Sequence, residues 1–416
     1  MNAHLAETRG SLNSRAYFSR KMALWGLCFW AFAQPLSIAA SNIAIVMMLV
    51  GLLGYRRSAQ NFPSLRGPLE KPLWIYFFIG ILTIVLSGIW KGGLGQIAKD
   101  GQMLCDFYIF SSAFILEGGI IVLGFWAAGF ALAAFLGIGE FFFWRFAQER
   151  AIIFNATFKN SHLWSSIYAS SRAHGTIHPV TFGEIMVMAL LGALSYYVVC
   201  RRKGEFSGFL SIFLSLFAMM ALALSGTRGA WVGFFVGSSV LLLFEFQATI
   251  LGVLGTAGIL LVQIFYSPRF SSSKVFNPQE DSFKIHLSLW KTAGRMFMDH
   301  PLLGVGSGHF GAFFNRYHRV PFAGQDTWGN AHNLYLHQLA ERGLLGFAAL
   351  SLVLGTMILR SWKLYGQTRS FLSLWFLSWM AAFLFMNLTE SAFQVGMVWM
   401  PTLALYCWME GDNHAL

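Results

Sequence analysis

The sequence predicts an all-α, polytopic membrane protein with about 12 transmembrane helices. Only 11% of its 416 residues are charged and 56% are hydrophobic, whereas roughly 25% of the residues in a soluble domain are charged. Apolar runs of roughly 20 residues, the length that crosses a bilayer as a helix, recur along the chain. Because these runs are continuous rather than alternating, they favour helices over a β-barrel.

The expected spans divide the chain into three parts. Residues 1–266 form a transmembrane region of about nine spans, residues 267–333 a long polar loop, and residues 334–416 a second region of about three spans. Such a connection is too long for a passive linker, so we expect it to contain helices and functional residues. The apolar runs lie at 22–37, 38–54, 72–90, 104–116, 119–144, 181–200, 207–224, 229–246, 248–266, 334–359, 370–388 and 391–409.

Basic residues in the short loops predict the orientation. With twelve spans, four basic clusters fall on one face, which the positive-inside rule makes cytoplasmic. Both termini are then cytoplasmic, and the loop 267–333 lies on the opposite side. No cleavable signal pattern follows the polar first 21 residues, so we expect the first run to stay as an anchor. The clusters are Arg15, Arg20 and Lys21; Arg56 and Arg57; Arg201, Arg202 and Lys203; and Arg360 and Lys363.

The formal net charge of +11 is larger than this bias alone requires. Basic residues on the opposite face indicate an anionic substrate. Nucleic acid is a poor candidate partner, because the sequence has no basic run and no soluble basic domain. The four cysteines lie in or at the ends of apolar runs, without metal spacing or a disulfide framework.

Residues 281–298 of the long loop are expected to form an amphipathic helix. It either lies along the membrane surface or packs as a small helix on its neighbours. Pro301 and the glycines that follow should end it. Its apolar stripe is Phe283, Leu287, Trp290 and Phe297, and its polar stripe is Lys284, Ser288, Lys291 and Arg295.

Arg228 is the first candidate for chemistry. It lies in the turn 225–231 between two apolar runs, where an arginine is costly unless it snorkels to lipid headgroups or pairs. The functional alternative is a guanidinium fork that holds phosphate oxygens. Flanking Gly226 and Gly229 would let a ligand approach the backbone.

Further candidates for substrate binding are expected on the same face. Arg172 and His174 precede the sixth span, where His178 should cap a helix. Arg295 and Lys291, one turn apart, either contact an anion or form a solvated face. The histidines of the loop 172–179 have no acidic neighbour in the sequence and no zinc spacing, so no metal is predicted.

His332 is the candidate base, at the junction of the long loop and a membrane helix. A neutral imidazole there could take a proton from an attacking hydroxyl at neutral pH. Asn333 is its neighbour. Glu341 and Glu390 are expected at or near the same face, where either could orient a histidine or an arginine, or form a salt bridge.

These segments together resemble the bacterial O-antigen ligase family, part of the O-antigen ligase and polymerase superfamily. The most specific pattern is His-(Asn/Ser/Gln)-x9-Gly-x-x-Gly, which His332, Asn333, Gly343 and Gly346 match. The other matches are the turn 225–229, the loop 172–179 and the stretch 295–306. Within the turn, residues 226 and 227 depart from the residues that are commoner in the family.

The resemblance implies an inverting, metal-independent glycosyltransferase of lipopolysaccharide biosynthesis. It would lie in the lipids of the bacterial inner membrane. Its active site and the long loop would lie on the periplasmic face. The donor would be a polysaccharide on undecaprenyl pyrophosphate and the acceptor a sugar hydroxyl of the lipid A core. No cofactor is expected, because the activated bond arrives with the donor. We assign Arg172, Arg228 and Arg295 to the pyrophosphate and His332 to the hydroxyl.

Two other interpretations stay open. An O-antigen polymerase of the same superfamily would use the same donor but pass the glycan to another lipid-linked glycan. A secondary transporter would suit twelve spans, although the related halves expected of one are not evident in the sequence. A polyprenyl pyrophosphate bound in an outward-facing cavity would favour the enzymes.

Overall fold

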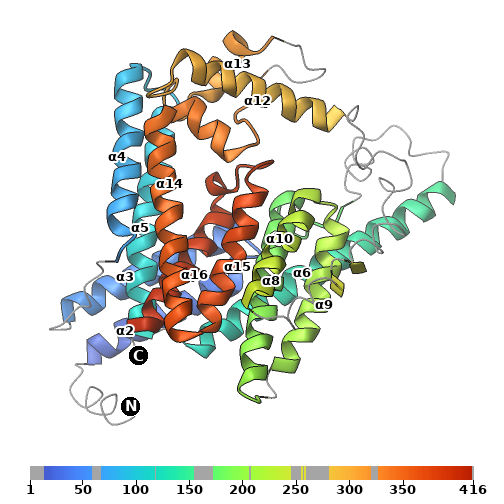
Figure 1. Ribbon diagram of the computed structural model, residues 1–416. Coiled ribbons are helices and arrows are strands. Elements are labelled where there is room, and N and C mark those ends of the chain that lie inside the picture. The colour runs from blue at the N-terminus through green and yellow to red at the C-terminus, as the bar shows by residue number, and fades with distance from the viewer. Residues whose placement is uncertain are drawn as a thin grey trace.

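The computed structural model describes residues 14–58, 67–117, 119–153, 172–205, 208–244, 254–255, 257–258, 281–319 and 327–414. Over these residues the fold is helical and contains no strand (Figure 1), which confirms the predicted class. The elements are α2 (Ser14–Ala33), α3 (Ile38–Ser58), α4 (Glu70–Ser87), α5 (Gly93–Glu117), α6 (Ile120–Ile153), α8 (Pro179–Arg202), α9 (Gly208–Ser225), α10 (Arg228–Phe244), α12 (Asp281–Asp299), α13 (Phe310–Tyr317), α14 (Leu334–Thr368), α15 (Phe371–Met386), the 3-10 turn η1 (Ala392–Gln394) and α16 (Gly396–His414).

Five of the described helices are long and apolar enough to cross a membrane, namely α3, α4, α8, α14 and the Ile120–Phe143 part of α6. Ile43, Val46, Val50 and Leu53 lie on one face of α3 and are 48–64% exposed. Such a contiguous apolar face suits lipid rather than water. A multi-pass membrane protein is therefore confirmed, whereas the total of twelve spans stays a prediction. The ninth expected run, 248–266, lies almost entirely outside the described residues.

Several helix ends differ from the ends of the predicted apolar runs, and two starts are of interest. The run expected at 104–116 is the second half of α5, which starts at Gly93. Hydropathy missed its first turns because they carry polar residues such as Asp100, whose partner lies inside the protein. The last run does not begin at 391, because η1 precedes α16 and the helix starts at Gly396.

The amphipathic helix is confirmed as α12, but its buried face is not the predicted one. Leu289, Ala293 and Met296 are fully buried in a cluster with residues of α13 and α14, whereas Leu287 is 37% exposed. The helix turns this face inward because it packs on its neighbours, at one end of the bundle (Figure 1). The side chain of Phe283 lies outside the described part.

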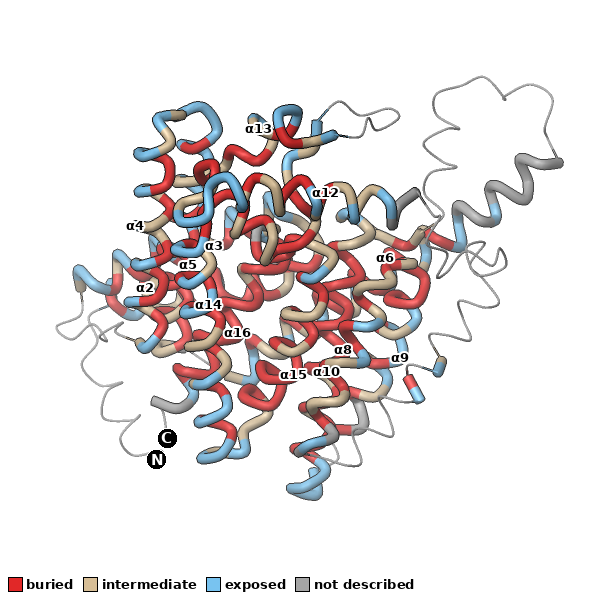
Figure 2. The backbone as a smooth tube through the Cα atoms, turned by 45° about the horizontal axis from the view of Figure 1, so that its top comes forward, coloured by how far each residue is buried: buried red, intermediate tan, exposed pale blue. Residues whose placement is uncertain are grey.

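Buried residues fill the centre of the bundle, and exposed ones line its outside (Figure 2). Indole rings make much of this centre. Trp126 is fully buried and lies 5.2 Å from Trp375 and 5.7 Å from Trp30, measured between ring centroids. Because aromatic side chains bury the most area per residue, this cluster ties early and late helices together.

α14 breaks at Gly343, whose φ of 60° and ψ of −160° are not helical. The break frees backbone groups that the segment after α12 satisfies, as buried amides and carbonyls require. Four hydrogen bonds of 2.8–3.2 Å do this, with amides donating to carbonyls: Leu344 to Pro301, Leu345 to Leu302, Val305 to Ala340 and Gly306 to Glu341. The first part of α14, which His332 precedes, is thereby fixed against α12 and α13.

Candidate active site

His332 lies two residues before α14 and faces Glu390, which lies in the turn after α15. The Nδ1 of His332 is 3.4 Å from Oε2 of Glu390, and both side chains are partly exposed. When Nδ1 carries the proton toward the carboxylate, Nε2 is left as the acceptor for a substrate proton. The pair therefore has the arrangement of an oriented general base.

The backbone at His332 has a φ of +45°, a left-handed conformation that histidine adopts more readily than most residues. Two hydrogen bonds hold it there. The His332 amide donates to Oδ1 of Asn330 (3.0 Å), and its carbonyl accepts from Nε1 of Trp290 (3.4 Å). The imidazole is thus placed by α12 as well as by α14.

An aromatic and imidazole cluster surrounds His332. The ring of His286 lies 5.4 Å and that of Trp328 5.5 Å from the His332 ring, between centroids. Burial lowers the pKa of His286, and the neighbouring charges of His332 and Arg228 lower it further, while Glu390 opposes them. His286 is therefore held neutral beside the candidate base. The sequence analysis did not predict His286 as a site residue. Its position one helical turn before Trp290 is the sequence feature that could have indicated it.

Arg228 begins α10, directly after a tight turn. Gly226 takes a φ of +64° there. Arg172 supports the turn, since its Nε donates to the carbonyl of Ser225 (2.6 Å) and its Nη2 to Oγ1 of Thr227 (2.8 Å). A guanidinium at a helix N-terminus combines two sources of positive potential, which favours an anion at this position.

The predicted residues of the 172–178 loop lie within electrostatic range of the candidate base. Burial lowers the pKa of His178, and the charges of Arg172, His174 and His332 lower it further, while Glu390 opposes them. His178 is thus within electrostatic range of both Arg172 and His332. The structure therefore brings together five of the predicted residues, Arg172, His174, Arg228, His332 and Glu390, around His178 and His286.

His174 has an acidic partner, contrary to the prediction. Its Nε2 is 3.2 Å from Oε1 of Glu140 on α6, whose Oε2 accepts from the Gly175 amide (2.8 Å). The sequence could not reveal this pair, because Glu140 and His174 are far apart in the chain and meet only in the folded structure. His178 caps α8 as predicted, its Nδ1 accepting from the amide of Val180. Among the described residues, no group of three or more His, Cys, Asp or Glu side chains is arranged to hold a metal.

Asn333 caps α14. Its Oδ1 accepts from the amide of Leu336 (3.0 Å), and its Nδ2 donates to the carbonyl of Leu388 (2.9 Å). The side chain thereby ties the start of α14 to the turn that carries Glu390. Direct substrate binding by Asn333 stays a prediction.

Arg295 and Lys291 are further along α12. Nη1 of Arg295 donates to the carbonyl of Tyr317 at the end of α13 (2.9 Å), and Lys291 is exposed. At ~1.5 Å per residue, Arg295 lies about 13 Å along the helix from His286. The structure thus assigns Arg295 a contact that fixes α13, and its contact with pyrophosphate stays a prediction.

Glu341 and His337 form a separate, buried pair, 3.4 Å apart. The carboxylate of Glu341 also accepts from the amides of Gly308 (2.8 Å) and Phe310 (2.9 Å). These contacts hold the loop before α13 against α14. Of the two acidic residues considered as partners of a histidine at this face, Glu390 therefore belongs to the His332 site and Glu341 to its framework.

The fold and site define a multi-pass helical membrane protein with a carboxylate-paired histidine and clustered arginines at one end. Residues 210–351, which include Arg228 and His332, match the family model described as O-antigen ligase. The predicted resemblance to this family is thereby confirmed over that segment. An uncharacterized protein of Haemophilus influenzae (strain Rd KW20) is 28% identical over 206 residues, which cover 44% of this chain and 51% of that protein. The match thus spans about half the length of that relative.

Proposed function

We propose that the protein is an O-antigen ligase, an inverting, metal-independent glycosyltransferase at the periplasmic face of a bacterial inner membrane. It moves a polysaccharide from undecaprenyl pyrophosphate to a hydroxyl of the lipid A core. One observation carries the proposal. His332, whose ring is paired with Glu390, lies within electrostatic range of His286, as Arg228 does, and of His178, as Arg172 does. Both His332 and Arg228 fall in the segment that matches the family.

In this mechanism His332 acts on the acceptor. Its unprotonated nitrogen takes the hydroxyl proton while the hydroxyl oxygen attacks the anomeric carbon of the donor sugar. Glu390 stabilises the imidazolium that forms. The bond from the anomeric carbon to the pyrophosphate oxygen breaks on the opposite side of the sugar, so the configuration inverts.

The leaving pyrophosphate takes the bonding electrons and the negative charge. Arg228 and the N-terminus of α10 stabilise that charge, and Arg172 keeps the turn in shape. Preorganised cations in a site with little water do this without rearrangement during the reaction. In this proposal the arginines serve the donor and the histidine serves the acceptor.

The test uses a bacterial strain that lacks its own ligase, complemented with this protein at matched expression. Wild type should restore the O-antigen ladder on lipid A core, and His332→Ala should not. His300→Ala is the matched control, because His300 is an exposed histidine just beyond α12 and should leave the ladder intact.

A different outcome would identify the polymerase of the same superfamily. Wild type would then leave the lipid A core bare and, in a strain lacking a polymerase, build long chains on the undecaprenyl carrier. That result would overturn the acceptor assignment but keep the donor.

A further inference from the structure

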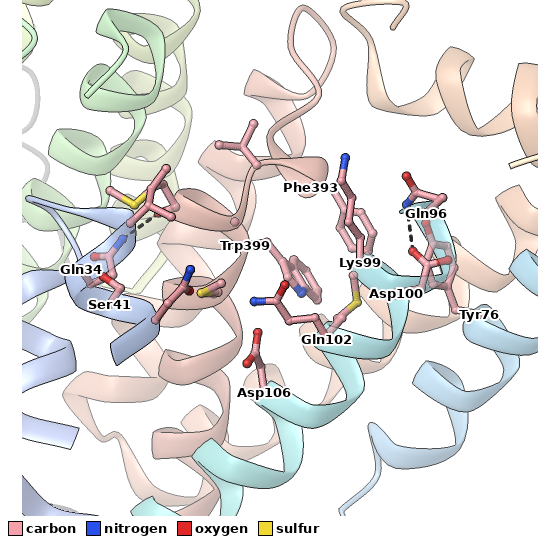
Figure 3. Close-up of a pocket in the computed structure, with 17 residues that line it drawn as sticks. Gln34, Ser41, Tyr76, Gln96, Lys99, Asp100, Gln102, Asp106, Phe393 and Trp399 are labelled. Carbon is pink, nitrogen blue, oxygen red and sulfur yellow. Dashed lines mark hydrogen bonds between the residues drawn. The ribbon is translucent and has the colours of Figure 1, made fainter. Parts of the chain in front are cut away.

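A cavity of about 250 Å³ lies among α3, α5 and the η1–α16 segment, apart from the His332 pair (Figure 3). One stripe of α5, with side chains three or four residues apart, forms its polar wall. Its polar members are Gln96, Lys99, Asp100 and Asp106, and Met103 lies among them. Phe393 and Trp399 supply aromatic surface on the other side.

Asp100 is already satisfied within the protein. Its Oδ2 accepts from Nη2 of the buried Arg342 (2.5 Å), and its Oδ1 accepts from Nε2 of Gln96 (3.0 Å). The charge of Asp100 is thus balanced by Arg342. The remaining charges of the cavity wall are Lys99 and Asp106, one of each sign.

Two buried polar groups in the wall have no partner among the described residues. Asp106 is 3% exposed, and no described residue donates a hydrogen bond to its carboxyl group. Trp399 is 4% exposed, and its Nε1 has no acceptor. Buried polar groups are normally paired, so each needs an explanation. Figure 3 shows both side chains, with Gln102, facing the cavity.

These two groups restrict the ligand. The carboxylate of Asp106 needs a donor, while the indole N–H of Trp399 needs an acceptor. A metal cation would leave the indole unpaired, and a phosphate, which Lys99 would attract, would bring no hydrogen-bond donor to the carboxylate of Asp106. A neutral ligand rich in hydroxyls serves both, because each hydroxyl donates and accepts. Aromatic faces beside polar groups complete a wall suited to a ring with one apolar face.

The cavity also shares a backbone segment with the candidate active site. The amide of Leu334, at the start of α14, donates to the carbonyls of Asn387 (2.9 Å) and Glu390 (3.1 Å). Oδ1 of Asn387 accepts from the amide of Phe393, which lines the cavity. A ligand held there is therefore next to the segment that positions the His332–Glu390 pair.

We infer that this cavity binds a sugar ring of a lipid-linked saccharide, with Asp106 and Trp399 as its hydrogen-bonding partners. Its volume, slightly below the ~300–1,000 Å³ typical of small-molecule sites, fits one or two rings rather than a long glycan. That this saccharide is a substrate of transfer rests on the proposed function. The ring belongs either to the acceptor or to the donor, which the experiment separates.

The first measurement reads binding without activity. Gln102→Cys is made in a Cys105→Ala background, because Cys105 is exposed whereas Cys28, Cys200 and Cys407 are buried. Maleimide labelling of the new thiol is followed in phosphatidylethanolamine and phosphatidylglycerol vesicles. Added lipid A core or undecaprenyl-pyrophosphate glycan should slow the labelling, and the lipid that protects identifies the source of the ring.

Adding Asp106→Asn or Trp399→Phe to this background should abolish the protection. Glu70→Gln is the control, since this carboxylate accepts from the Tyr108 hydroxyl outside the cavity. In the transferase assay Asp106→Asn should raise KM for the protecting lipid about tenfold, with kcat nearly unchanged, as expected for loss of a hydrogen bond to a charged group.

Labelling that neither lipid slows would show that the cavity binds no saccharide. Protection that persists in Asp106→Asn would show that Asp106 does not hold the ring. Either result would overturn the inference. If labelling is protected but wild type transfers no glycan, the proposed function fails and the saccharide site stands.

Discussion

Gly343→Ala is the most demanding test of the geometry around α14. At φ 60° and ψ −160°, the residue occupies a region that is essentially restricted to glycine. A Cβ there would also collide with the backbone carbonyl group of Leu302 and lie 2.5 Å from the nitrogen of Leu303. Both neighbours are backbone, so neither can rotate away as a side chain would.

The two effects set the expected magnitude. Backbone strain of this kind costs about 1–3 kcal/mol, and overpacking of a tight contact costs about 1–3 kcal/mol more. The sum, about 2–6 kcal/mol, would lower the melting temperature by roughly 2–7 °C, from the unfolding entropy per residue of soluble domains applied to a chain of 416 residues. Four hydrogen bonds between the 301–306 segment and α14 would be strained as well.

The assay is thermal unfolding of purified protein in one detergent. Gly355→Ala is the matched control, because Gly355 lies in the same helix and a Cβ there meets nothing within 4 Å. An alanine at that position should be neutral or stabilise by about 0.5–1 kcal/mol. If Gly343→Ala melts with Gly355→Ala and keeps its activity, the break in α14 is not the fixed feature described above.

Three other predictions concern the site. Glu390→Gln should lower kcat about 10–100-fold with KM nearly unchanged, because protonated His332 loses its carboxylate; unchanged steady-state kinetics would contradict the pairing. Arg172→Lys keeps the charge but loses the guanidinium fork that holds the turn, so the free energy of unfolding should fall by about 1–3 kcal/mol. Equal melting curves for the variant and the wild type would refute this. The pKa of His286 is lower in the folded protein than the ~6.5 of an unfolded chain. As the pH falls below ~6.5, the unfolded state therefore takes up a proton first, and the folded protein loses stability until the pH reaches the folded-state pKa. His286→Gln should flatten that acid-side fall in melting temperature, leaving the part due to His178.

Apolar runs predicted most of the helices because lipid-facing segments must be apolar along their whole length. They failed where a helix faces the inside of the bundle. The first turns of α5 carry Gln96 and Asp100, which are satisfied by contacts from distant elements. A hydropathy window records their polarity but not the partner that compensates it.

The site was predictable where it depends on local sequence, and less so where it depends on packing. His332 and Arg228 stand at helix starts, and the sequence marks such places. The pairing of His174 with Glu140 joins residues 34 positions apart, and no local pattern predicts it. The same holds for His286, which reaches His332 because α12 packs on the start of α14. Arg295 illustrates the same limit, since the helix that carries it was predicted but its contact with Tyr317 was not.

The spacing of the motif follows from the backbone as much as from chemistry. Asn333 starts the helix and Gly343 breaks it, so the nine residues between them form one short rigid piece that carries Glu341 to the loop before α13. Gly346 then leaves room for the stem of Arg342, because a Cβ there would collide with the Cβ of that arginine. Arg342 in turn reaches Asp100 in the wall of the cavity. The glycines of the pattern therefore link the candidate base to the candidate sugar site, and a change at either glycine should disturb both places without removing a reacting group.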